Sequence, residues 1–117
     1  MKAVPSAPLA PNLLVAIRNM SGDALDELVG RFVLHTEPMR AVGASTTWDG
    51  AGRVAAALTA LGYDLVTRLS AGKCLCRVSR AEGPNGATRE LATAEGASLP
   101  EAVARAALLA CIARPNA

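Results

Sequence analysis

Apolar residues recur along this chain with two spacings, one typical of helices and one typical of strands. From Gly22 to Leu34 they return every three or four positions, which predicts an amphipathic helix after a Ser21 cap. Acidic side chains near its amino end suit the helix dipole. The expected apolar stripe comprises Leu25, Leu28, Val29 and Phe32.

A second helical pattern begins at Thr46 or Thr47 and ends at Gly62. Either threonine can cap the helix, and Asp49 stands three residues after Thr46, as in a capping box. Gly62 is the expected stop, because glycine adopts the left-handed conformation that commonly ends helices. The predicted apolar face comprises Trp48, Ala51, Val54, Ala55, Leu58 and Leu61.

After Gly62 the spacing changes to the alternation of strands. Residues 63–69 and 73–80 flank the short turn Ser-Ala-Gly and predict a hairpin, and residues 87–94 predict a weaker third strand. In the second strand, one face is expected to point away from the helices and carries Lys73, Leu75 and Arg77. The opposite face carries Cys74, Cys76 and Val78.

The last predicted helix begins at Ser98, with Glu101 at the capping-box position. One face, expected to lie on the sheet, carries Leu99, Val103, Ala106 and Ala110. The opposite face begins with Glu101 and Arg105 but ends with Leu108 and Ile112, so its second half needs cover. We favour cover by the first helix. If a second copy of the chain covers it instead, Leu108 and Ile112 are partner-binding residues.

The elements follow the order α-α-β-β-β-α, which predicts an α+β fold: a three-stranded antiparallel β-meander with helices packed on it. A chain of 117 residues is long enough for one hydrophobic core, which we place in residues 20–114. Residues 1–19 are Pro-rich and are expected to form a flexible leader, or alternatively a functional arm. Residues 115–117 are expected to be a tail.

Composition excludes several classes of protein. Hydrophobic residues make up 51% and charged residues 19% of the chain, which argues against disorder. A net charge of +2 is too small to predict a polyanion partner. No apolar run is long enough to predict a membrane span. The three cysteines are expected to be free thiols in a reducing cytoplasm.

Candidate chemistry is sparse. Cys74 and Cys76, with Cys111 and His35, are the residues from which a metal site would be built, but the second close ligand pair of zinc signatures is missing. We favour a structural role for the cysteines as small core residues. No nucleophile motif or phosphate-binding loop occurs, so we expect neither an enzyme nor a cofactor.

Basic residues gather on the first predicted hairpin. They are Arg68, Lys73, Arg77 and Arg80, with Arg89 on the next strand. If Lys73, Leu75 and Arg77 point away from the helices, they form a mildly basic, partly apolar sheet surface. This surface is either a partner-binding face or an ordinary solvated face.

Three stretches together resemble the phage ABA-sandwich domain family: "TTWDGAGRVAAALTALGYDLVTRL", the hairpin after it, and "AEGASLPEAVARAALLA". In that family a capped helix ending in Leu-x-x-x-Gly-Tyr leads into a hairpin, and an Ala-rich helix closes the domain. Here Cys-Leu-Cys replaces the usual aromatic residues of the second strand.

The resemblance implies a phage or prophage accessory protein in the host cytoplasm, with no reaction assigned. We expect it to act through contacts with an unknown host or phage protein, in counter-defence or particle assembly. We also expect it to be a monomer or weak homodimer.

The alternative is a nucleic-acid-binding module, because residues 47–113 follow the α-β-β-β-α order of the double-stranded RNA-binding domain. That fold uses lysines at the start of its last helix to contact phosphates. Glu101 stands in that region here, so we do not expect nucleic acid to be the partner.

Overall fold

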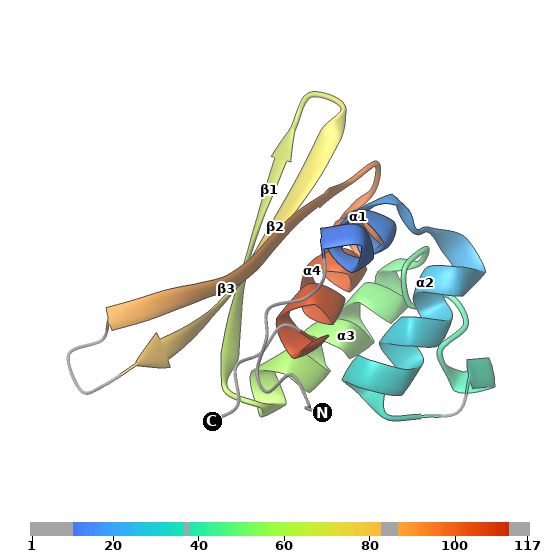
Figure 1. Cartoon of the computed structure of the whole chain (residues 1–117), viewed down its shortest axis with the longest axis horizontal. Coiled ribbons are helices and arrows are strands. Elements are labelled where there is room, and N and C mark those ends of the chain that lie inside the picture. Colours follow the sequence, from blue (N-terminus) through green and yellow to red (C-terminus); the bar gives the residue numbers. More distant parts are fainter. Residues whose placement is uncertain (1–10, 37, 83–86, 113–117) are drawn as a thin grey trace, which may run out of the picture.

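Residues 11–36, 38–82 and 87–112 are described by a computed structural model, and they form helices on one side of a three-stranded sheet (Figure 1). The strands β1 (Tyr63–Ser70), β2 (Lys73–Glu82) and β3 (Ala87–Gly96) are antiparallel in the order β1-β2-β3. The expected α+β fold is confirmed. The α-helices of the described residues are α1 (Pro11–Asn19), α2 (Gly22–Val29), α3 (Trp48–Ala60) and α4 (Leu99–Ile112).

Helix α4 occupies the centre of the core. It contacts β2 and β3 on one side and α1, α2 and α3 on the others. Its buried positions include Pro100, and small alanines allow its neighbours to approach closely. At Gly96 a Cβ atom would lie only 2.7 Å from the backbone nitrogen of Ala102, so the end of β3 packs directly against α4.

The second half of the expected leader is helical. Residues 11–19 form α1, and the side chain of Ile17 is completely buried in the core. The prediction of a flexible leader is therefore wrong for these residues, whereas residues 1–10 lie outside the described part of the chain. The Pro-rich composition does not exclude this helix, because Pro11 is the first residue of α1, a position that tolerates proline.

Helix α2 forms where the pattern predicts it and is continued by a π-helical turn, η1 (Gly30–Leu34). Ser21 lies at the N-cap position, but its side chain makes no capping hydrogen bond. Leu25 and Val29 are buried as expected, whereas Phe32 is 41% exposed. The wider π turn brings Val33 into the core in place of Phe32.

Helix α3 is capped by Thr47, whose Oγ1 accepts a hydrogen bond from the backbone nitrogen of Gly50 at 2.9 Å. Val54 and Leu58 are buried as predicted, but Trp48 is 69% exposed. Gly50 packs against the backbone of residues 43–44. Because Trp48 lies about 200° from Gly50 around the helix, this packing directs the indole outward.

Asp26 ties the long loop before α3 to α2, although the sequence indicates only a favourable helix-dipole position for it. Its carboxylate is buried and accepts hydrogen bonds from the backbone nitrogens of Gly43, at 2.9 Å, and Ser45, at 2.7 Å. The hydroxyl of Ser45 donates a third, at 2.6 Å. The side chain therefore fixes the path of the loop through three donors.

Ile17→Ala is expected to lower the free energy of unfolding by about 2–4 kcal/mol, because it removes a fully buried aliphatic side chain. Val15→Ala is the matched control in the same helix, since Val15 is exposed, and should change stability by less than about 0.5 kcal/mol. Urea unfolding of both variants measures the difference. Equal small effects would show that α1 contributes nothing to the core.

Asp26→Ala is expected to cost about 2–4 kcal/mol, because three donors lose their acceptor, two of them in buried positions. Asp23→Ala, an exposed position in the first turn of the same helix, should cost less than about 1 kcal/mol. Thermal and urea denaturation compare the two variants. A loss no greater for Asp26→Ala than for Asp23→Ala would refute the anchoring role.

Candidate functional site

The face of the sheet that points away from the helices is open. Cys76, Val78 and Ala94 are buried in the core, and the residues that alternate with them along β2 and β3 therefore lie on the opposite face. Lys73 and Arg77 are exposed and Leu75 is half-buried. These three side chains therefore point away from the helices, and Arg68 joins them because it pairs with Leu75.

Charges on this open face are balanced. Lys73 Nζ lies 3.7 Å from Glu95 Oε1, and Arg77 Nε lies 3.3 Å from Glu90 Oε1. Exposed pairs of this kind contribute little to stability, but they neutralise the basic side chains locally. By register, the charged residues of the face are the bases Arg68, Lys73 and Arg77 and the acids Asp64, Glu90 and Glu95.

An apolar strip lies between these charges. Val66 is 54% exposed and pairs with Arg77, while Leu75 pairs with Arg68 on the neighbouring strand. The two apolar residues are diagonal neighbours on one face, a separation across which side chains still interact. A small apolar centre with a charged rim is the arrangement found in protein–protein interfaces.

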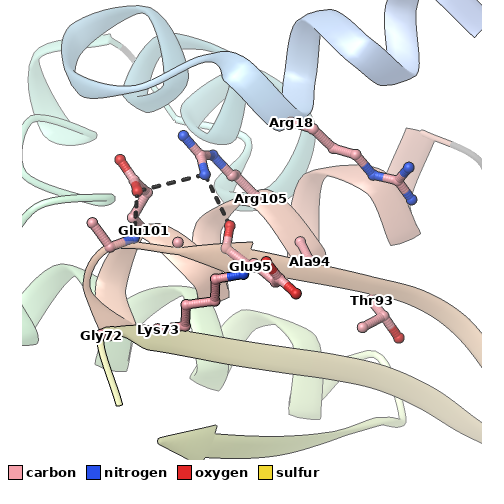
Figure 2. Close-up of a pocket in the computed structure, with 10 residues that line it drawn as sticks. Arg18, Gly72, Lys73, Thr93, Ala94, Glu95, Glu101 and Arg105 are labelled. Carbon is pink, nitrogen blue, oxygen red and sulfur yellow. Dashed lines mark hydrogen bonds and ion pairs between the residues drawn. The ribbon is translucent and has the colours of Figure 1, made fainter. Parts of the chain in front are cut away.

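A pocket of about 720 Å³ adjoins this face along β3 (Figure 2). It lies between the end of α1 and the start of α4, and Lys73, Thr93 and Glu95 belong to both the pocket and the open face. The lining residues are Arg18, Gly72, Lys73, Thr93, Ala94, Glu95, Gly96, Ala97, Glu101 and Arg105.

Arg105 holds the walls of the pocket together. Its Nε donates to the carbonyl oxygen of Met20 at 3.0 Å, and its Nη1 donates to the carbonyl oxygen of Glu95 at 2.8 Å. Nη1 also lies 3.5 Å from the Glu101 carboxylate, and both charged side chains are mostly buried. One guanidinium thus connects Met20, directly after α1, with the edge of β3 and with α4. Figure 2 shows its interactions with Glu95 and Glu101.

The start of α4 is capped from within the chain. Ser98 Oγ accepts from the backbone nitrogen of Glu101 at 3.4 Å, and Glu101 Oε1 accepts from the backbone nitrogen of Ala97 at 2.9 Å. The predicted capping box therefore forms, with the glutamate reaching one residue before the cap.

Arg18 supplies the unneutralised charge of the pocket. Figure 2 shows it on the helix side of the pocket, with Thr93 on the strand side. Glu101 pairs with Arg105, and Glu95 pairs with Lys73. Arg18 has no ion pair or hydrogen bond with any other described residue. The pocket can therefore accept a carboxylate beside this guanidinium.

Leu108 and Ile112 pack against the rest of the same chain. Leu108 is fully buried and Ile112 is half-buried against the core. Helix α2 and its π-helical continuation contact α4, so the cover comes from the same chain, as we favoured. The prediction that Leu108 binds a partner is therefore corrected, because its side chain is inaccessible in the folded chain.

The cysteines of β2 lie on the core side of the sheet. Cys76 is fully buried, and its burial raises the pKa of the thiol from 9.0 to about 11, so the group is neutral at pH 7. Within the described ranges, His, Cys, Asp and Glu side chains form no cluster of three or more suited to a metal ion. His35 is exposed at the end of η1.

No helix among the described residues is both long enough and apolar enough to span a bilayer. Comparison of the chain with family models, with curated proteins and with solved structures gives no match.

Burial of the Cys76 thiol predicts a loss of stability in alkaline solution. Because folding raises its pKa, the stabilisation is complete below about pH 9 and disappears as the pH rises towards about 11. Urea unfolding between about pH 8 and about pH 10.5 should show a smaller loss for Cys76→Ala than for the unmodified protein. Cys74→Ala is the control, because it retains the Cys76 thiol. Parallel pH profiles for Cys76→Ala and Cys74→Ala would contradict the assignment.

Proposed function

We propose that this protein is a non-enzymatic protein-interaction module. Its partner contacts the open face of the sheet and places an acidic side chain in the adjoining pocket. The proposal rests on one observation: Lys73, Thr93 and Glu95 belong both to the open face and to the pocket, so the two surfaces are continuous. A segment lying across the sheet meets the apolar strip and the pocket together.

The chemistry of the two surfaces indicates the kind of partner. Val66 and Leu75 offer apolar contacts, and a partner side chain over them loses little polar hydration. Arg18 offers a guanidinium that no described acidic side chain occupies. A protein segment with an apolar residue near an aspartate or glutamate satisfies both requirements.

The resemblance to the phage ABA-sandwich family supports a biological setting for this activity. On that basis we place the protein among phage or prophage accessory proteins in the host cytoplasm, with a host or phage protein as its partner. Counter-defence and particle assembly are the two roles that such a binding module fits.

A nucleic-acid partner is less well supported. Basic and acidic residues are equal in number on the open face, so few phosphates would be neutralised there. At the start of α4, the Glu101 carboxylate occupies the capping position and pairs with Arg105. Sub-micromolar binding of a double-stranded RNA that persists at about 0.2 M salt would favour the nucleic-acid function instead.

The protein-binding function is tested by selecting binders from a displayed library of random linear peptides. Selected peptides should combine acidic and apolar residues, and Arg18→Ala and Leu75→Ala should each weaken their binding about tenfold in fluorescence anisotropy. Arg31→Ala is the matched control, because Arg31 is an exposed arginine that pairs with Glu27 on α2. Recovery of no binders, or equal affinity for all three variants, would reject the proposed surface.

A further inference from the structure

Residues 64–70 of strand β1 form an edge of the sheet that no other described residue pairs with. The strand pairs with β2 along its whole length, from Tyr63 opposite Arg80 to Ser70 opposite Lys73, without a bulge. No described residue forms a backbone hydrogen bond to residues 64–70 from the other side. Figure 1 shows β1 and its turn extending beyond the helices.

The other edge of the sheet is protected. The pairing of β3 with β2 is interrupted by a register shift between Val78 and Ser79. Arg105 binds the carbonyl oxygen of Glu95, so this edge already has a partner near the end of β3. Bulges and charged side chains of this kind prevent strands from pairing between molecules. Strand β1 has no bulge, and no described side chain binds the backbone of residues 64–70.

Turn geometry determines which backbone groups of β1 face outward. The two-residue turn Ala71–Gly72 makes Ser70 and Lys73 a hydrogen-bonded pair, so the even-numbered residues of β1 direct their N–H and C=O groups towards β2. The odd-numbered residues direct theirs to the free edge. Within residues 64–70, these outward residues are Leu65, Thr67 and Leu69.

Side chains along β1 are self-complementary about Val66. Asp64 lies two residues before it and Arg68 two residues after it, and all three share the open face of the sheet. Asp64 and Arg68 are exposed, and neither forms an ion pair with another described residue. An antiparallel copy of the strand therefore presents the opposite charge to each of them.

We propose that two copies of this chain associate by antiparallel pairing of their β1 strands, with the two-fold axis at Val66. Asp64 of each copy then lies opposite Arg68 of the other, and the two Val66 side chains meet on the axis. Leu65 lies opposite Thr67 of the second copy. The two three-stranded sheets become one continuous sheet.

Backbone and side chains favour the same register. The outward-facing residues form the hydrogen-bonded pairs, so the charged residues and Val66 fall in the non-hydrogen-bonded pairs, where facing side chains are closest. An axis at Leu65 would place Asp64 opposite Val66, and an axis at Thr67 would place Arg68 opposite Val66. Only the axis at Val66 forms both ion pairs.

Exposed apolar area on β1 gives this pairing a hydrophobic contribution. Val66 is 54% exposed and Leu69 is 66% exposed in the single chain. Pairing covers Val66 with its own copy and brings Leu69 beside a strand. The two Val66 side chains lie side by side on the axis, while Leu75 and the pocket stay uncovered on the open face, so the dimer does not depend on the proposed function and does not block it.

Charge reversal tests the dimer by sedimentation equilibrium at concentrations up to about 1 mM. The unmodified protein should show a monomer–dimer equilibrium. Asp64→Arg and Arg68→Asp should each weaken it about tenfold, because like charges then face each other twice in every dimer. An equimolar mixture of the two single variants should dimerise again, as should the double variant with both reversals.

Thr67→Pro provides an independent test, because it removes an N–H group that faces the free edge while leaving the bonds to β2 in place. Dimerisation should be lost while the circular dichroism spectrum is retained. Recovery of the dimer in the mixture shows that the charge variants are folded. A protein that stays monomeric, or a dimer that survives both reversals and the proline, overturns the proposal.

Discussion

Burial of α4 on nearly every side is the constraint on which the rest of the structure depends. A helix rich in alanine has no bulky ridge, so the sheet and the other helices can approach its axis closely. That proximity requires a glycine where β3 meets α4, at Gly96. Because the alanines fill little volume, three other helices must supply the larger side chains of the core. Ile17, Leu25 and Leu58 come from α1, α2 and α3, and each is fully buried.

Local signals in the sequence account for most of the fold. Thr47, Gly62 and Ser98 act at helix ends through hydrogen bonds or backbone conformation that involve neighbouring residues only. Alternation along β2 assigns Cys76 and Val78 to the core because a strand turns successive side chains to opposite faces. Such features are readable from the sequence because their physical cause lies within a few residues.

The features that escaped prediction depend on contacts distant in the sequence. Helix α1 is held through Ile17 and through the bond from Arg105 to Met20, 85 residues away. Asp26 is a helix-dipole residue in the sequence and a loop anchor in the structure, because its partners lie 17 and 19 residues further along. The open face was predictable from alternation. The pocket was not, since it exists only where α1 meets the edge of β3.

This dependence on α1 has a thermodynamic consequence for any molecule that occupies the pocket. Arg18 stands beside β3 only when α1 is docked, and Arg105 holds that arrangement through backbone carbonyls on both sides. Binding and docking of the helix are therefore linked equilibria. A molecule that binds only the assembled pocket stabilises the folded chain by about 2.7 kcal/mol at a hundred times its dissociation constant. Conversely, the observed affinity of the pocket is lower than its intrinsic affinity, because binding also shifts the docking equilibrium of α1 towards the docked state.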